Sequence, residues 1–148
     1  MSIIKNYNSI YNSIKLLSKN TTLIVVTKNQ ELNKINLLIN AKHFDFGENR
    51  VQEATLKWKN LLLNNINLKL HLIGKLQSNK AKEAFELFHF IHTLDNEKLA
   101  LIFSKLESNS VKKIKYFIQV NIGNEFQKME FWLIRQMSLL NTVLMILS

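Results

Sequence analysis

The sequence predicts an α/β fold in which the strands of one parallel sheet alternate with helices. Helical and strand patterns alternate along the chain, which is the signature of this fold class. The strands expected from apolar runs begin near positions 22, 43, 68, 89 and 115, so neighbouring starts lie 21 to 26 residues apart. That spacing accommodates one strand, one crossover helix and two short loops.

The first half of the chain shows the alternation clearly. Apolar residues recur at helical spacing over residues 3–17, which predicts an amphipathic opening helix. The β-branched run at 23–26 is typical of a strand buried on both faces. A second helical stripe covers 32–39, and a second strand is expected at 43–46. A third helical stripe, which includes a tryptophan, covers 51–62.

The second half repeats the same unit. Residues 68–73 form an apolar run that predicts the third strand, and small and aromatic residues line a helix at 81–88. A fourth strand is expected at 90–93, followed by a helix at 99–106. The aromatic and β-branched run at 116–120 predicts the fifth strand.

The net charge of +9 admits two interpretations. Only Arg50 and Arg135 are arginines, whereas nucleic-acid-binding proteins favour arginine for its planar, bidentate guanidinium. The chain also has 19 asparagines and 16 isoleucines, an excess that resembles coding by an AT-rich genome. We expect a solvated lysine surface, and the alternative is an anion-binding face formed by the clusters Lys112/Lys113/Lys115 and Lys75/Lys80/Lys82.

The composition also bears on the compartment. No cysteine is present, which excludes a disulfide framework and agrees with a reducing cytoplasm. The first 19 residues lack the pattern of a signal peptide. The apolar stretch 131–148 is interrupted by Arg135 and falls short of the ~20 apolar residues that span a bilayer. We therefore expect a cytoplasmic protein without a membrane segment.

Lys28 is the most informative candidate for chemistry. Functional groups of parallel α/β proteins collect where strands end, and Lys28 directly follows the first expected strand. Partial burial there would favour the neutral amine that forms a Schiff base with an aldehyde cofactor. The alternative is an ordinary surface lysine in a lysine-rich chain.

Asn49 and His71 are further candidates, and each admits two interpretations. Asn49 follows the second strand and either caps the next helix or points its amide at a ligand. His71 lies within an apolar strand, where it is either a hydrogen-bonded core residue or a ligand contact. Gly47 and Gly74 stand where strands are expected to turn toward helices, and we expect them to supply backbone conformations that other residues avoid.

Several familiar sites are absent from the sequence. With three scattered glycines, the chain contains neither a dinucleotide-binding nor a Walker A loop, and it has no serine nucleophile elbow. The remaining histidines show no metal-ligand spacing, so we expect structural roles for His43, His89 and His92 and no metal site.

Three stretches resemble the pyridoxal-phosphate homeostasis family (YggS/PROSC type). They contain Val-Val-Thr-Lys at 25–28, Gly-Glu-Asn within 45–53, and His-Leu-Ile-Gly-Lys-Leu-Gln-Ser-Asn-Lys at 71–80. Residues 92–95 and 118–122 are similar to the family's fourth and fifth strands, in the same order. The resemblance covers about residues 1–128, and the second and third stretches are highly specific.

The resemblance implies a (β/α)8 TIM-type barrel like the N-terminal domain of alanine racemase, incomplete here with about five strands. It implies that pyridoxal 5′-phosphate is held as a Schiff base on Lys28, beside Asn49 and His71, with Asn121 as a weaker candidate. It also implies a role in cofactor homeostasis without catalytic turnover, and a monomeric full-length protein that binds neither nucleic acid nor membrane. The alternatives are a basic nucleic-acid-binding module and a racemase-like enzyme on the same cofactor.

The resemblance stops abruptly after Lys128. We therefore divide the chain into a partial barrel domain, 1–128, and a non-matching tail, 129–148, as a shifted reading frame or truncation would produce. Five strands cannot close a barrel, so the first and fifth would be bare edges. We expect that the tail, whether or not it forms a helix over an exposed face, does not complete the barrel, and that the chain is less stable than its full-length relatives.

Overall fold

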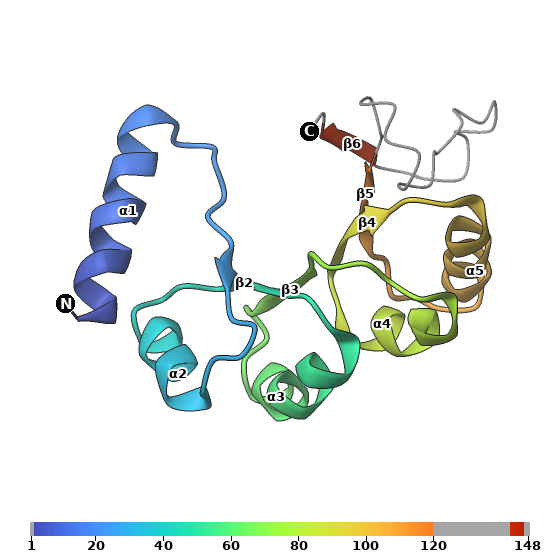
Figure 1. The fold of residues 1–148 in the computed structure, drawn as a ribbon, viewed down its shortest axis with the longest axis horizontal. Helices are drawn as coiled ribbons and strands as arrows, with labels where there is room; N and C mark the ends of the chain where they lie inside the picture. Colours follow the sequence, from blue (N-terminus) through green and yellow to red (C-terminus); the bar gives the residue numbers. More distant parts are fainter. Residues whose placement is uncertain (1, 120–142, 147–148) are drawn as a thin grey trace.

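The computed structural model describes residues 2–119 and a strand at residues 143–146. Helices and strands alternate as the sequence predicts (Figure 1). The helices are α1 (Ile3–Leu17), α2 (Leu32–Asn40), α3 (Val51–Asn64), α4 (Ala81–Leu87) and α5 (Glu97–Ser108), with a short 3-10 helix η1 (Ser78–Lys80). The strands are β1 (Val25–Val26), β2 (Asp45–Glu48), β3 (Lys69–Leu72), β4 (Phe90–Leu94), β5 (Lys115–Gln119) and β6 (Val143–Ile146).

All the strands belong to one parallel sheet, in the order β1-β2-β3-β4-β5-β6. The parallel α/β class predicted from the sequence is therefore confirmed. The second strand begins two residues later than expected, because the chain before it closes α2. The amides of Lys42 and His43 donate to the carbonyls of Ile39 and Leu38, and Lys42 adopts a positive φ of 63°.

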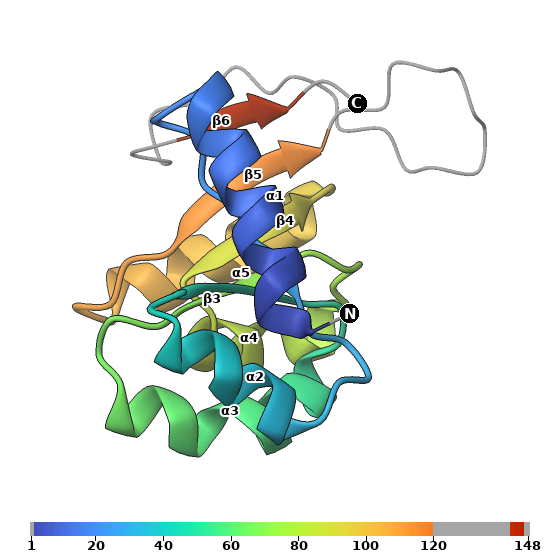
Figure 2. The same cartoon turned by 90° about the vertical axis from the view of Figure 1, so that its left-hand side faces the viewer.

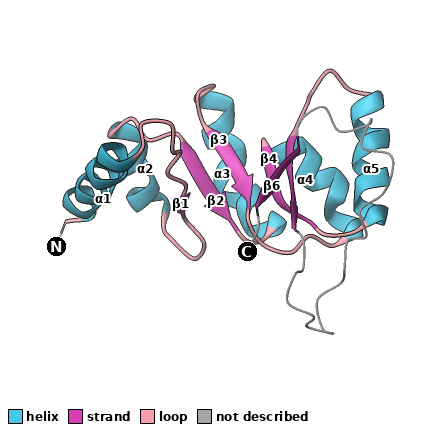
Figure 3. Cartoon of the chain, turned by 90° about the horizontal axis from the view of Figure 1, so that it is seen from above, coloured by secondary structure: helices cyan, strands magenta, loops and turns pink. Residues whose placement is uncertain are grey.

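The sheet has two different faces. Helices α2 to α5 line its outer side, and the strands curve along the inner side of this arc (Figures 1 and 3). The apolar core lies between sheet and helices, where Phe46 packs against Trp58 with ring centroids 4.8 Å apart, and Tyr116 packs against Phe103 at 5.2 Å. Alternate residues of the strands face the concave side, because side chains of a strand alternate between its faces.

Helix α1 joins this arrangement by one end. It stands beside β1 and α2 and buries none of its residues fully (Figure 1). Its clearest contact is Tyr7, whose ring lies edge-on to that of His43 at 5.2 Å and whose hydroxyl is 3.2 Å from His43 Nδ1. The structural role expected for His43 agrees with this contact and with its burial.

The tail, residues 129–148, differs in one respect from the expectation that the fifth strand is a bare edge. Residues 143–146 form β6, which runs parallel to β5 with Tyr116 opposite Val143, and Figure 2 shows the two as neighbouring arrows. The fifth strand is therefore not a bare edge, and this part of the tail is not helical. No pairing joins β1 to β6 in the described part of the chain, so the described sheet is open. The remaining tail positions, 129–142 and 147–148, lie outside the described residues.

Gly47 and Gly74 are needed for a different reason than the one expected from the sequence. Neither Gly47 nor Gly74 has a positive φ, so the expected special backbone conformations are not observed. Gly47 lies inside β2, where a Cβ would be 3.1 Å from a methyl carbon of Ile24 and 3.2 Å from one of Ile73. A Cβ at Gly74 would lie 2.8 Å from Asn49 Cα and 2.9 Å from its carbonyl carbon. Close approach of neighbouring chain segments is what requires glycine here.

Candidate functional site

The ends of β1 and β2 bring the first two candidate residues together. Val26 lies opposite Gly47 in the sheet, and the amide of Thr27 continues the pairing by donating to the carbonyl of Gly47 at 2.9 Å. Lys28 and Asn49 follow at the same edge of the sheet, two residues beyond this pair. They line one hollow of about 220 Å³ together with Asn29, Arg50 and Glu53.

Lys28 presents a free amine to this hollow. In the described part of the chain, its Nζ atom has neither a hydrogen-bond nor an ion-pair partner. The partial burial expected from the sequence is wrong, because the Lys28 side chain is exposed. The reason is the open sheet: β1 is a short strand paired with β2, and no other strand of the described residues lies on its far side.

Asn49 is held from the side of the next strand. The loop after β3 packs against Asn49. A Cβ added at Gly74 would lie only 2.8 Å from Asn49 Cα, so the two backbones are in close contact. The amide of Ile73 also donates to the carbonyl of Glu48 at 2.9 Å. These contacts fix the backbone of Asn49. The N-cap residue of α3 is Arg50 and not Asn49, and the Arg50 side chain makes no capping hydrogen bond.

A second hollow lies on the other side of Asn49. It measures about 400 Å³ and is lined by Asn49, Arg50, Val51, Gln52, Lys75, Leu76, Gln77 and Lys80. Its basic side chains come from the loops after β2 and β3 and from η1. The strand-end edge is thus positively charged on both sides of Asn49.

His71 lies away from these two residues. It is opposite Gly47 on the concave face of β3, and only 3% of its surface is exposed. Gly47 is also opposite Val26, so Lys28 lies two residues further toward the ends of the strands than His71 does. Its Nε2 atom is 3.2 Å from Asp45 Oδ1, and its Nδ1 atom is 2.9 Å from Nε2 of His92. Both ring nitrogens are therefore engaged within the protein. Of the two interpretations of His71 that the sequence allowed, these contacts fit the hydrogen-bonded core residue.

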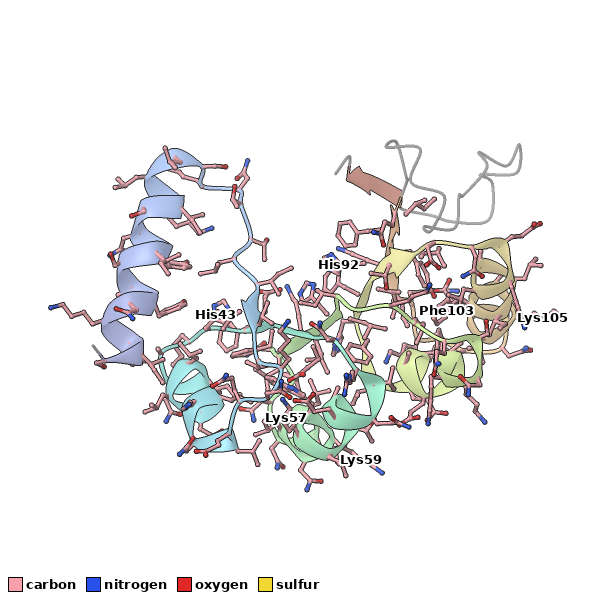
Figure 4. The ribbon with its side chains drawn as sticks, viewed as in Figure 1. His43, Lys57, Lys59, His92, Phe103 and Lys105 are labelled. Atoms are coloured by element: carbon pink, nitrogen blue, oxygen red, sulfur yellow. The ribbon has the colours of Figure 1, made fainter. Side chains whose placement is uncertain are left out.

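Aromatic stacking completes this histidine pair. The His71 ring stacks on Phe90 at 4.1 Å with an interplanar angle of 7°, and the His92 ring stacks on Phe117 at 4.2 Å. Figure 4 shows His92 on the concave side of the sheet and Phe103 on the side of α5. Sequence spacing did not reveal the contact between His71 and His92, because they lie on neighbouring strands and only the sheet register brings them together.

Burial sets the ionisation of this cluster. It lowers the pKa of His71 to about 4 from its ordinary value of 6.5, against the opposing effect of the Asp45 hydrogen bond, and it also lowers the pKa of His92. The unfolded chain therefore binds a proton to His71 between about pH 6.5 and pH 4, while the folded chain does not. The stability contributed by neutral His71 is complete above about pH 6.5 and is lost as the pH falls toward 4.

We expect the free energy of unfolding to fall across this window, with a share on the order of 3 kcal/mol from His71. Urea unfolding followed by circular dichroism at several pH values measures the dependence. In His71→Gln the slope between pH 6.5 and 4 should be shallower than in the wild-type chain. An unchanged slope would show that His71 does not titrate in this way.

Comparison with known proteins identifies the family. The pyridoxal phosphate homeostasis protein of Buchnera aphidicola (Acyrthosiphon pisum, strain APS) is 38% identical over 109 residues, which are 74% of this chain and 54% of the relative. The protein of the same name from Haemophilus influenzae is 34% identical over 135 residues, covering 86% of this chain and 57% of that protein. No protein-family profile matches the chain.

Solved structures agree with the sequence relatives. PipY of Synechococcus elongatus PCC7942, solved without PLP, superposes with a TM-score of 0.78 at 34% identity, covering 87% of this chain and 58% of PipY. The chain belongs to the pyridoxal phosphate homeostasis protein family. A second PipY structure, with PLP bound, superposes with a TM-score of 0.64 at 29% identity. The resemblance inferred from the sequence is confirmed, as is its fold, a partial TIM-barrel-like arrangement.

The chain spans about half the length of the family members it matches. Asn121, the weaker candidate, lies outside the described residues. No described helix is long and apolar enough to cross a membrane. Among the described residues there is also no group of three or more histidine, aspartate or glutamate side chains that could hold a metal ion.

The three lysines of the basic cluster near β5 contact three different groups. Lys112 Nζ donates to the Glu86 carbonyl at 2.7 Å, Lys113 lies 3.9 Å from the Glu107 carboxylate, and Lys115 lies over the ring of Phe90. The three charges thus point to separate partners. Lys75 and Lys80 of the other cluster line the second hollow.

Sequence reasoning missed a buried polar network behind the strand ends. Glu48 is fully buried on the helix side of β2, and its Oε1 atom accepts hydrogen bonds from Thr27 Oγ1 at 2.8 Å and Trp58 Nε1 at 3.0 Å. Lys57 of α3 forms an ion pair with the same oxygen at 2.7 Å. The available signal was Glu48 itself, at the end of a strand expected to be buried, because a buried carboxylate needs partners.

Proposed function

We propose that this chain binds pyridoxal 5′-phosphate through a covalent bond to Lys28 Nζ, as a protein of cofactor homeostasis. The observation that carries the proposal is the exposed, unpaired amine of Lys28 in a hollow shared with Asn49 and Arg50. The family relationship supports it, because the related PipY has a structure with PLP bound. Relatives bear the name pyridoxal phosphate homeostasis protein.

The residues present fit such a ligand chemically. The cofactor supplies an aldehyde carbon that a lysine amine attacks. Lys28 presents that amine without a carboxylate partner, so its lone pair is available once it loses a proton. The amide of Asn49 offers both a donor and an acceptor for polar groups of a ring. The guanidinium of Arg50 offers a planar set of donors suited to an anionic group.

His71 enters the proposal as a residue beneath the site. Its ring nitrogens are engaged by Asp45 and His92, and it lies one side-chain level below Lys28 on the concave face. We propose that it keeps the floor of the site rigid and aromatic by stacking on Phe90. A direct hydrogen bond to the cofactor would first require one of the two existing contacts to break.

Binding without turnover is the second part of the proposal. Racemisation or decarboxylation needs a proton donor or acceptor placed opposite the lysine. The acid in the hollow is Glu53, whose pKa is lowered chiefly by the hydrogen bond from Lys57, so it stays ionised. Glu53 Oε1 also accepts from the Asn29 amide, so this carboxylate is tied to the backbone beside Lys28 and is not placed opposite it. We further propose that the protein is cytoplasmic and that a full-length member is monomeric.

A binding titration tests the proposal. Pyridoxal phosphate is added to the purified chain, and the absorbance band that appears when the aldehyde combines with an amine is followed. We expect Lys28→Ala to lose nearly all of the saturable absorbance change, because it removes the unpaired amine. Lys59→Ala, which removes an exposed lysine on the outer side of α3, should bind as the wild-type chain does. Equal saturable binding by the Lys28→Ala chain would refute the proposal.

A further inference from the structure

We propose that Lys57 is a positioning residue for Lys28, an inference that rests on the function proposed above. The Lys57 Nζ atom contacts three acceptors at once. It donates to the carbonyl of Thr27 at 2.7 Å, and it forms ion pairs with Glu48 Oε1 at 2.7 Å and Glu53 Oε1 at 2.8 Å. Figure 4 shows Lys57 and Lys59 on the same helix, and only Lys59 is exposed.

The first contact holds the residue before Lys28. The Thr27 carbonyl accepts from Lys57, the Thr27 hydroxyl donates to Glu48, and the Thr27 amide donates to the Gly47 carbonyl. Every polar group of Thr27 is therefore engaged, and its side chain is buried. Glu48 in turn depends on Lys57, because its Oε2 atom has no hydrogen-bond partner among the described residues and Oε1 alone carries the ion pair.

The second carboxylate holds the residue after Lys28. Glu53 Oε1 accepts from the backbone amide of Asn29 at 2.6 Å while it is paired with Lys57. Asn29 has a positive φ of 57°, a left-handed conformation that asparagine adopts more readily than most non-glycine residues, and its amide is held there by Glu53. One ammonium group thus fixes the backbone on both sides of Lys28 through two carboxylates.

The same contacts keep Lys28 free of an ion pair. Glu53 lines the hollow that Lys28 also lines, and it is the acidic residue in that lining. While Lys57 holds the Glu53 carboxylate, Lys28 remains unpaired. Without Lys57, the cations that line the hollow with this carboxylate are Lys28 and Arg50. A carboxylate paired with Lys28 favours its protonated form, which is not nucleophilic.

The proposal predicts how labelling depends on pH. Pyridoxal phosphate is trapped on the chain with borohydride at several pH values, and the fraction on Lys28 is measured by peptide mass spectrometry. In Lys57→Met, we expect the share of label on Lys28 to fall and its half-maximal pH to rise, because Glu53 is released toward Lys28. The double variant Lys57→Met/Glu53→Gln removes the released charge and should return the half-maximal pH to the wild-type value.

Matched variants separate positioning from folding. Lys57→Arg keeps a cation with several donors and should retain most of the labelling, and Lys59→Met should behave as wild type. Should Lys57→Met not fold, as judged by circular dichroism, Glu53→Ala provides the test. It removes the acceptor of the Asn29 amide, whose hydrogen exchange should accelerate by roughly tenfold or more, and the share of label on Lys28 should fall.

Two failures can be told apart. A wild-type chain that takes no label at Lys28 contradicts the proposed function itself. A wild-type chain labelled at Lys28, together with a folded Lys57→Met chain of unchanged share and half-maximal pH, overturns only the role of Lys57. An unchanged Asn29 amide and an unchanged share of label in Glu53→Ala would overturn it as well.

Discussion

Replacing Gly74 by alanine is expected to destabilise the chain by about 3 kcal/mol and to displace Asn49 from the strand-end hollow. The added Cβ would lie 2.8 Å from Asn49 Cα and 2.9 Å from its carbonyl carbon, distances that require the backbone to move. Overpacking that shifts backbone typically costs about 1–3 kcal/mol and occasionally more. Urea unfolding followed by circular dichroism measures the loss, and a pyridoxal phosphate titration measures the effect on the site.

Gly47→Ala is the matched control for Gly74→Ala. Its Cβ would lie 3.1 Å from a methyl carbon of Ile24 and 3.2 Å from one of Ile73, and these are flexible ends of side chains. A shift of a few tenths of an ångström relieves such contacts, so we expect a smaller loss. A Gly74→Ala chain as stable as the wild type, with the same cofactor affinity, would contradict the close packing described at Asn49.

Trp58→Ala is expected to lower the free energy of unfolding by about 3–5 kcal/mol, the usual cost of removing a large buried aromatic side chain. Trp58 is fully buried, packs on Phe46, and donates a hydrogen bond to the buried Glu48 carboxylate. The substitution therefore leaves a cavity and also removes a donor from a charge that cannot reach water. Whole domains are stable by only about 5–15 kcal/mol, so much of the margin would be lost.

Trp58→Phe separates these two contributions. It keeps most of the ring volume and removes the Nε1–H donor, so we expect a loss of about 1–3 kcal/mol from the weakened network around Glu48. Both variants are compared with the wild-type chain by urea unfolding, with circular dichroism as the signal. A Trp58→Ala chain no less stable than Trp58→Phe would mean that the core described between β2 and α3 does not support the fold.

The fold was predictable because its signals are local. The apolar stripes of α1, α2 and α3 follow helical spacing, and each of these three helices begins at the residue where its stripe begins. The regular spacing of the strand starts, with room for one crossover helix between neighbours, then implied a parallel sheet. The start of β2 was placed two residues early because Phe44 and Phe46 look equally strand-like, whereas the preceding residues are used to close α2. That closure depends on backbone hydrogen bonds that leave no trace in the apolar pattern.

The site was predictable in part. Strand-end position brought Lys28 and Asn49 to one hollow, as the topology of parallel sheets requires. The partial burial expected for Lys28 rested on its position directly after a strand, and the structure leaves the side chain exposed because the described sheet is open at β1. The pairing of His71 with His92 and of Glu48 with Lys57 joins different elements. Such contacts are set by sheet register and helix rotation, which sequence spacing does not reveal.

Identification of the lysine that holds the cofactor tests the central claim most directly. The full 148-residue chain is incubated with pyridoxal phosphate at limiting concentration, reduced with borohydride, digested, and mapped by mass spectrometry. We predict that the label lies predominantly on Lys28, although the chain offers many exposed lysines. Label spread over surface lysines such as Lys59, with Lys28 unmodified, would contradict the account.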